Sequence, residues 1–208
     1  MTQARLLDIA VREFGLHGLD GASTRAIAKA ADTAMSSITY HYGGKDGLYL
    51  AAADHIARRM ADELAPALAA EEAVGDDDRD AARAAVQRLV ARFVDKMASE
   101  DTADWSLFIM REQLKPGEAF ERIWAGMMGQ LSRRMADLIA AATGARAGAA
   151  RVTTLTLMGQ ALTVRACRAA VLRLCEIETL DAATLDHIKA RIAANVDAVL
   201  DRLIAEKD

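Results

Sequence analysis

Apolar residues recur every three or four positions along most of the chain, which is the spacing of one face of an α-helix. The clearest stripe, in residues 118–142, consists of Phe120, Trp124, Met127, Leu131, Met135 and Leu138. Weaker stripes of the same kind predict helices at about residues 3–17, 45–64, 81–97, 103–114, 149–175 and 182–205. We therefore expect an all-α protein.

Helix-breaking residues divide these stripes. We expect Gly15 and Gly18 to end the first helix, and Pro66 to kink or end the helix that starts at Lys45. The acidic residues 71–80, with Gly75 among them, are typical of a surface linker. The expected organisation is an N-terminal domain over residues 1–48 that continues into a connector helix at 45–65, followed by a helical domain over residues 66–208.

Two short apolar patterns within residues 23–42 predict a pair of short helices. Ser23 can cap the first because its hydroxyl accepts from otherwise unpaired amides of the first turn. Asp32 and Thr33 interrupt the pattern, and Ile38 and Tyr42 then define the buried side of a second helix. Two short helices joined by a tight turn predict a helix-turn-helix, in which the second helix enters the major groove of DNA and the first crosses the phosphate backbone.

The residue types of the second helix fit that placement. Small side chains near its start let the backbone approach base edges, hydroxyls bond several bases, and Met35 suits a thymine methyl group. A hydroxyl, an imidazole and an ammonium follow at Tyr40, His41 and Lys45, and these groups suit phosphate oxygens; for His41 the alternative is an ordinary surface histidine. The candidate DNA-contacting residues are Ser23, Thr24, Arg25, Ala34, Met35, Ser36, Ser37, Thr39, Tyr40, His41 and Lys45.

The same stretch resembles the DNA-binding domain of TetR/AcrR-type transcriptional regulators. The resemblance rests, in chain order, on Arg25, Ile27-Ala28, Asp32-Thr33, Tyr40-His41-Tyr42, Lys45 and Leu48. The run YHYGGKDGLYLA and the residues around Arg111-Glu112 and Pro116 are similar to the subgroup with a CecR-like C-terminal region.

The chain departs from the family pattern at two positions. Asp32 stands where glycine is usual, and Thr39 stands where many relatives have tyrosine, with Tyr40 next to it. The resemblance implies a homodimer formed through the last two helices, repression as the usual mode, and control by a small molecule.

An effector cavity is expected where aromatic and methionine side chains gather. Four of the nine aromatic residues lie within residues 105–124, and pockets for small molecules are largely apolar with a few polar anchors. The candidate pocket residues are Trp105, Phe108, Arg111, Phe120, Trp124, Met127, Met128, Gln160 and Arg165. The alternative is that the apolar residues are plain core and that Arg111 and Glu112 are structural, each with a different partner because neighbours on a helix do not face each other.

The last two predicted helices carry apolar faces and small residues suited to a four-helix interface between two subunits. The alternative is that both only cover their own core. Cys167 and Cys175 lie in one predicted helix, about 12 Å apart by rise, which is too far for a disulfide. We expect both to be buried as small apolar side chains, with a redox or metal role as the alternative.

Composition narrows the function. Of 208 residues 52% are hydrophobic and 4% aromatic, which favours helices over sheet. The net charge is −4, but residues 1–59 hold seven lysines and arginines against six acidic residues, so the acidity lies outside the proposed DNA-binding face. No apolar run reaches the length of a membrane span and no signal peptide is evident, so we expect a cytoplasmic protein.

Catalytic and metal-binding motifs are absent from the sequence: there is no HExxH, GxSxG, P-loop or CxxC, and the four histidines are scattered. We therefore expect no cofactor and no metal. The sequence predicts a transcriptional regulator that binds a double-stranded DNA operator as a homodimer and responds to an apolar or amphipathic small molecule. The alternatives are a ligand-sequestering helical protein without DNA binding, an enzyme within a helical bundle, and an activator that uses the same operator.

Overall fold

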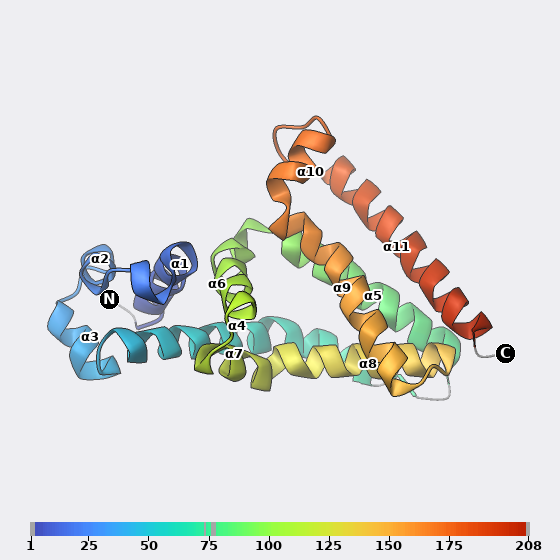
Figure 1. The fold of residues 1–208 in the computed structure, drawn as a ribbon, viewed down its shortest axis with the longest axis horizontal. Helices are drawn as coiled ribbons and strands as arrows, with labels where there is room; N and C mark the ends of the chain where they lie inside the picture. The colour runs from blue at the N-terminus through green and yellow to red at the C-terminus, as the bar shows by residue number, and fades with distance from the viewer. Residues whose placement is uncertain (1–2, 73, 76–77, 207–208) are drawn as a thin grey trace. The chain divides into compact units, whose positions relative to one another are not determined.

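The structure, a computed structural model, describes residues 3–72, 74–75 and 78–206. Within these ranges it contains helices and no strand, which confirms the all-α prediction (Figure 1). The chain forms two compact units: the first combines Met1–Ala65 with Asp101–Gln130, and the second combines Pro66–Glu100 with Leu131–Asp208. Each unit thus draws on two separate stretches of the chain.

The first unit is built on α1 (Gln3–Gly21), whose apolar face buries Leu6, Leu7, Ala10, Val11 and Phe14. This helix packs against α6 (Ala103–Leu114). A Cβ atom at Gly15 would lie 3.0 Å from the Asp104 carbonyl oxygen, so the glycine allows the two helices to approach. The break expected from Gly15 and Gly18 occurs at Gly18, where φ of 70° and ψ of 176° form a kink between two helical segments, and the second segment carries α1 on to Gly21; Gly15 itself is helical.

Helix α4 (Lys45–Glu72) leaves the N-terminal region and contains Pro66 without ending there, contrary to one of the two outcomes expected for this proline. The end of α4 is held by ion pairing. The side chain of Glu71 is 1% exposed, and its two oxygens accept hydrogen bonds from Arg88 at 3.0 and 2.6 Å. The backbone carbonyl of the same residue accepts a bond from Arg134 at 2.6 Å.

The expected surface linker at residues 71–80 is therefore wrong for its first member, since Glu71 is a buried helical residue. A charge run can be buried when a basic side chain from another helix neutralises it, and Arg88 does so here. Val74, Gly75 and Asp78 lie outside helices. Residues 73, 76 and 77 of the predicted linker are outside the described residues.

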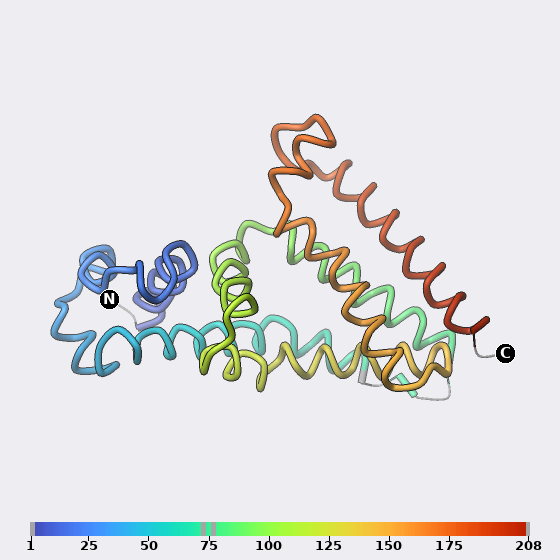
Figure 2. The backbone as a smooth tube through the Cα atoms, in the orientation of Figure 1, coloured from blue at the N-terminus to red at the C-terminus, as the bar shows by residue number. Residues whose placement is uncertain are grey.

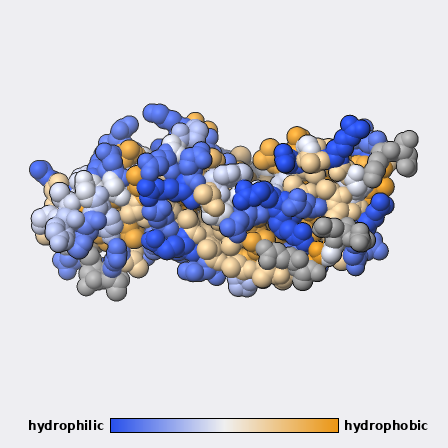
Figure 3. Space-filling model, turned by 90° about the horizontal axis from the view of Figure 1, so that it is seen from below, coloured by the Kyte–Doolittle hydropathy of each residue, from blue (hydrophilic) through white to orange (hydrophobic). Residues whose placement is uncertain are grey.

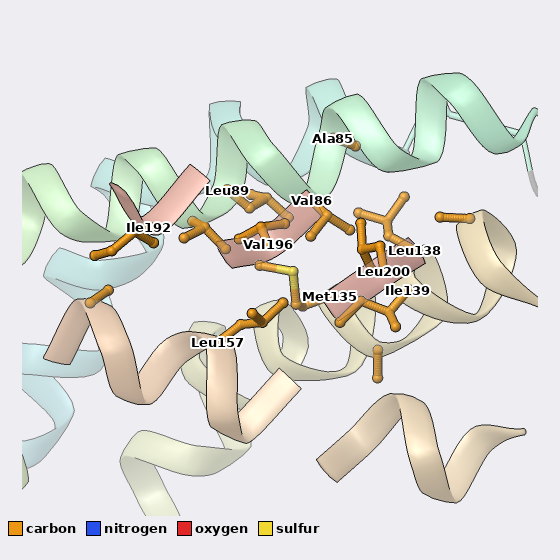
Figure 4. Close-up of a cluster of buried hydrophobic side chains, with 14 of the residues drawn as sticks. Ala85, Val86, Leu89, Met135, Leu138, Ile139, Leu157, Ile192, Val196 and Leu200 are labelled. Carbon is orange, nitrogen blue, oxygen red and sulfur yellow. The ribbon is translucent and has the colours of Figure 1, made fainter. Parts of the chain in front are cut away.

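The second unit contains α5 (Arg79–Ala98), most of α8 (Gly129–Thr143), α9 (Ala147–Ala166), α10 (Arg168–Leu174) and α11 (Ala182–Ala205). The course of α5, α9 and α11 can be followed in Figure 2. The apolar faces of α5, α8, α9 and α11 meet in one core, drawn in Figure 4. This core includes Val86, Leu89, Met135, Leu138, Ile139, Leu157, Val196 and Leu200.

Polar contacts also fasten the terminal helix to α5. Arg83 pairs with Asp197 at 2.7 Å and with Asp201 at 2.5 Å, and the Gln87 amide donates to the Ala193 carbonyl at 3.0 Å. The second unit therefore combines a continuous apolar core with a row of charged contacts along one side of α11.

Two long predicted helices are divided in the structure. The stripe at 118–142 is formed by α7 (Glu118–Ile123), a π-helical segment η2 (Trp124–Met128) and α8. The predicted helix 149–175 is split into α9 and α10 at Cys167, whose φ and ψ are −111° and 26°. A regular sequence stripe does not report such local changes of helical geometry.

Cys167 and Cys175 are both free and exposed, so the expectation that they are buried is wrong. Both cysteines flank α10, a helix that buries none of its residues, so neither is carried into the core. Hydrophilic and hydrophobic residues are interspersed on the face of the molecule in Figure 3. None of the helices in the described parts of the chain is both long and apolar enough to cross a membrane.

Candidate nucleic-acid interface and effector region

The turn between α2 (Thr24–Ala30) and α3 (Met35–Tyr42) is fixed by local hydrogen bonds. Ser23 caps α2, and its hydroxyl accepts from the Ala26 amide at 3.3 Å, as predicted. At the other end the Thr33 amide donates to the Ala28 carbonyl at 2.9 Å and the Asp32 amide to the Lys29 carbonyl at 3.1 Å. This pair of bonds, with Asp32 at a positive φ of 50°, is a Schellman motif.

Asp32 therefore occupies the left-handed backbone position for which glycine is usual. Aspartate is among the few residues that enter this region with a modest penalty. The turn keeps its geometry without the glycine, and α3 leaves it with Ala34 as its first flanking residue.

Helix α3 is anchored to the protein by one buried side chain, Ile38, which is 1% exposed. Around it the helix presents polar and small side chains outward: Tyr40 is 85% exposed and Met35 is 44% exposed. The rings of Tyr40 and His41 lie edge to face with centroids 5.0 Å apart. The exposed surface of α3 is therefore rich in hydroxyl groups, with an aromatic pair near its C-terminal end.

Glycines set the corner between α3 and α4. Gly43 and Gly44 have φ values of 73° and 112°, a region that side chains disfavour. A Cβ atom at Gly47 would lie only 1.7 Å from the Tyr42 carbonyl oxygen, so the backbones of the two helices touch there. The Lys45 ammonium donates to the Asp20 carbonyl at 2.9 Å and ties this corner to the end of α1.

The predicted DNA-contacting residues fall into two groups by exposure. The exposed group is Ser23, Arg25, Ala34, Met35, Ser36, Thr39, Tyr40 and His41. Thr24, Ser37 and Lys45 are half-buried. All of them lie on α2, on α3 or at the adjoining corners, and their contacts with DNA stay predictions.

The structure distributes the predicted effector residues more widely. Phe108 is fully buried and stacks on Tyr49, with ring centroids 4.7 Å apart, so it belongs to the core of the first unit. Phe120 stacks instead on Trp124, with centroids 6.0 Å apart, and Trp124 is 37% exposed. Trp105 and Met127 are buried, and Met128 is half-buried.

The two polar residues Gln160 and Arg165 belong to the second unit. The Gln160 side-chain oxygen accepts a hydrogen bond from Asn195 at 2.8 Å, and Arg165 donates to the Ser99 carbonyl. The structure therefore brings two of the predicted aromatic residues, Phe120 and Trp124, into contact, and it places Gln160 and Arg165 in the other unit. That the set forms one effector pocket stays a prediction.

Arg111 and Glu112 have different partners, as expected for neighbours on a helix. Arg111 donates to the carbonyls of Gly15 and Leu16 at the end of α1. Glu112 is 7% exposed and accepts two bonds, from the Tyr49 hydroxyl at 2.5 Å and from the Phe120 amide at 3.0 Å. This arginine–glutamate pair thus connects α6 to α1, α4 and α7.

The sequence analysis missed the role of Tyr49. Burial raises its pKa, and the hydrogen bond and negative charge of Glu112 raise it further. Tyr49 and Glu112 are 63 positions apart, so no local pattern indicates that they meet. Among the residues that the structure describes, no group of three histidine, cysteine or acidic side chains is suited to hold a metal ion.

A short helix anchored by one apolar residue, following a capped helix and a tight turn, defines the chain as a helix-turn-helix protein. Comparison with known families gives the same class. Residues 6–52 match the family of bacterial regulatory proteins of the tetR type, and residues 79–203 match the C-terminal domain of the HTH-type transcriptional dual regulator CecR.

The chain belongs to the TetR family of DNA-binding transcriptional regulators, with a CecR-type C-terminal domain. It is 30% identical to the HTH-type transcriptional dual regulator CecR of Shigella flexneri over 204 residues, which cover 96% of this chain and 91% of that protein. It is also 38% identical over 65 residues to the regulatory protein RaaS of Mycobacterium tuberculosis, which covers 31% of this chain and 30% of that one.

Solved structures share the fold at low sequence identity. AmtR of Mycobacterium smegmatis superimposes with a TM-score of 0.63 and 18% identity, covering 100% of this chain and 94% of that one. A TetR-like regulator from Rhodococcus gives 0.62 and 20%, covering 97% and 98%. These likenesses show that the fold is shared.

Proposed function

We propose that the protein is a one-component, ligand-responsive regulator that binds a pseudo-palindromic operator as a homodimer. The observation that carries this proposal is the outward face of α3, where Met35, Ser36, Thr39 and Tyr40 are exposed around the single buried anchor Ile38. Such a face is the part of a helix-turn-helix that reads the major groove.

The proposed contacts with DNA are of two kinds, contacts to base edges and contacts to phosphate oxygens. Met35, Ser36 and Ser37, at the start of α3, would meet base edges, which carry the sequence information. Tyr40, His41 and Arg25 would meet phosphate oxygens, which set register and carry none. Lys45 would add one charge at the corner, in addition to its bond to the Asp20 carbonyl.

Homodimerisation through α9 and α11 is supported by apolar side chains that the protomer leaves uncovered. Val152 and Leu155 on α9 are 60% and 69% exposed, although they lie on a helix that otherwise buries six residues in its own core. These two side chains are three positions apart on one face of the helix, and an apolar patch of neighbouring side chains favours a protein partner over water. The reading in which both helices only cover their own core leaves these two side chains unexplained.

Control by a small molecule would act through the linkage between effector binding and DNA binding. A molecule bound to the helical domain releases DNA only if it binds better to a conformation in which the two helix-turn-helix units of the dimer are not spaced to match the operator. We propose an apolar or amphipathic effector that contacts the aromatic pair Phe120 and Trp124, the one predicted aromatic pair with an exposed member. A protein that acts on DNA in this way would work in the cytoplasm.

The sign of regulation is proposed to be repression. One relative is named a dual regulator, which favours activation from the same operator as the second candidate. A reporter gene placed behind an operator that the protein binds separates repression from activation. Lower expression in the presence of the protein supports repression, and higher expression supports activation.

Selection of bound fragments from a random DNA pool tests the proposal as a whole. We expect enrichment of one palindrome by the parent protein and no enrichment by a variant in which Tyr40 and Ser36 are both alanine. A protein that enriches no sequence but still binds small apolar ligands would instead be the ligand-sequestering protein, and the regulator proposal would be wrong.

A further inference from the structure

Two arginines of the second unit lie beside the same short stretch of chain. Arg165 is in the last turn of α9, and Arg168 is the first residue of α10, one turn further on. Arg165 donates through Nη2 to the Ser99 carbonyl, and Arg168 pairs through Nη2 with the Glu100 carboxylate at 2.7 Å. Because Ser99 and Glu100 are adjacent, the two guanidinium groups share one neighbourhood.

Each arginine keeps a buried donor that nothing satisfies. Nε of Arg165 and Nη1 of Arg168 are inaccessible to solvent and have no hydrogen-bond partner among the residues that the structure describes. Buried guanidinium donors are normally bonded, because their desolvation is otherwise uncompensated. Two such donors on neighbouring side chains point to a group that is missing from the protein itself.

The charges at this place do not balance. Burial lowers the pKa of Arg165, Glu100 raises it, and the positive charge of Arg168 lowers it again. Two cations thus face one carboxylate, and the Glu100 side chain is 71% exposed, which weakens its effect. Among the groups that act on Arg165, positive charge therefore exceeds negative charge.

We propose that the Arg165–Arg168 pair binds a small monoanionic carboxylate. A carboxylate supplies one negative charge, and its two oxygens can accept from two separate donors. A phosphate would bring more negative charge than a carboxylate. This proposal goes beyond the proposed function and does not rest on it, because the site lies wholly within the second unit and the binding requires no DNA.

Thermal unfolding of the full chain without DNA tests the site. Sodium acetate, sodium benzoate, benzamide and sodium phosphate are compared at constant ionic strength made up with sodium chloride. We expect acetate and benzoate to raise the melting temperature with saturation, while benzamide, which resembles benzoate but carries no charge, binds at least about tenfold more weakly.

Three variants locate the effect. Arg165→Gln and Arg168→Gln should each weaken benzoate binding by at least about tenfold. Arg133→Gln removes the same charge from an exposed position of α8 and should leave binding unchanged. Circular dichroism checks that each variant is folded, and if Arg165→Gln is not, Arg168→Gln alone gives the comparison.

The proposal is overturned if neither carboxylate acts saturably on the parent, if benzamide acts as strongly as benzoate, or if the two arginine variants respond like the parent. A response to phosphate alone overturns the carboxylate assignment. Operator binding is measured separately on the same proteins. If the parent protein does not bind DNA, the proposed function is wrong, but the measured binding of carboxylate is unaffected.

Discussion

Helices α3 and α9 each leave a row of side chains uncovered, but the two rows differ in chemistry. On α3 the uncovered side chains are largely hydroxyl-bearing, such as Ser36, Thr39 and Tyr40. On α9 they include the branched apolar side chains of Val152 and Leu155. A hydrated, charged duplex is contacted by hydrogen-bonding groups, whereas a second protein subunit is held by apolar burial. The difference supports the proposal that α3 faces DNA and that α9 faces a second subunit.

Helices α3 and α9 also differ in how many side chains they bury in the protein. Helix α9 buries six side chains in the core of its unit, while α3 buries Ile38 alone. A helix of eight residues is not stable by itself in water. The exposed face of α3 is therefore maintained by the turns on either side of it, and substitutions in these turns act on DNA binding without touching DNA.

The largest effect is expected from Leu155→Asp on α9. A twofold interface buries this position twice, so a charge there should weaken dimerisation by about 3 kcal/mol or more, at least about a hundredfold. Sedimentation measures the change. The control is Leu114→Asp, at a leucine of α6 that is 88% exposed, which should remain dimeric. A Leu155→Asp protein as dimeric as the parent would exclude α9 from the interface.

Next in size is Tyr49→Phe, which removes the donor to the buried Glu112 carboxylate. We expect the free energy of unfolding to fall by about 1–3 kcal/mol, because a buried acceptor loses its partner. Tyr42→Phe, at a half-buried tyrosine, should change it by less than about 0.5 kcal/mol. Chemical denaturation measures both. An unchanged stability of Tyr49→Phe would show that the hydroxyl bond is dispensable.

Tyr49 also predicts a pH dependence with a definite sign. Its pKa is raised in the folded protein, so the protonated hydroxyl is favoured by folding. This contribution is complete below the unfolded-state pKa of about 10 and decreases as the pH rises beyond that value. The parent should lose stability above this pH more steeply than Tyr49→Phe. Parallel pH profiles would contradict the assignment.

Substitution of Ser36 by alanine should change which operators are preferred. Loss of one hydroxyl contact to a base edge is expected to relax discrimination at one base pair by about 1–3 kcal/mol, with the salt dependence unchanged. Binding to a set of single-position operator variants measures this. If affinity for every operator falls equally, Ser36 contacts the backbone and the reading assigned to it is wrong.

Tyr40→Phe should have the complementary effect. Removing only the hydroxyl is expected to weaken binding by about 0.5–1.5 kcal/mol on all sequences alike. Fluorescence anisotropy on specific and scrambled duplexes measures the change. A shift in preference between the two duplexes, instead of a uniform loss, would move Tyr40 from the phosphate-contacting group to the base-contacting group.

The smallest effect is expected at the turn. Asp32→Gly places glycine at a φ of 50° and should stabilise the protein by about 0.5–1 kcal/mol. The opposite sign is expected for Ala26→Gly, at an exposed helical position of α2, which should cost about 0.5–1 kcal/mol. Thermal unfolding of the pair gives the comparison. Destabilisation by Asp32→Gly would mean that the aspartate side chain itself supports the turn.

Local signals in the sequence predict local structure well here. The cap at Ser23 and the left-handed turn at Asp32 each depend on a few neighbouring residues, so both are readable from the chain. The family and the all-α fold follow from the same short-range patterns.

Features that depend on distant partners could not be predicted in this way. Helix α4 continues through Pro66, and Glu71 near its end is neutralised by Arg88, a residue of another helix. The break at Cys167 and the exposure of both cysteines depend on how α10, which buries none of its residues, packs in the folded unit. The partner of Glu112 is 63 residues away, and a stripe on one helix carries no record of such a contact.

The meeting of Gly47 with the Tyr42 carbonyl has one further consequence. With backbone against backbone and no side chain between them, the corner contains nothing compressible that could absorb a displacement. A rotation of the start of α4 would therefore displace the end of α3 as well. A methyl group added at position 47 would force these two backbones apart, so we expect it to shift α3 and, through α3, the proposed DNA-contacting side chains.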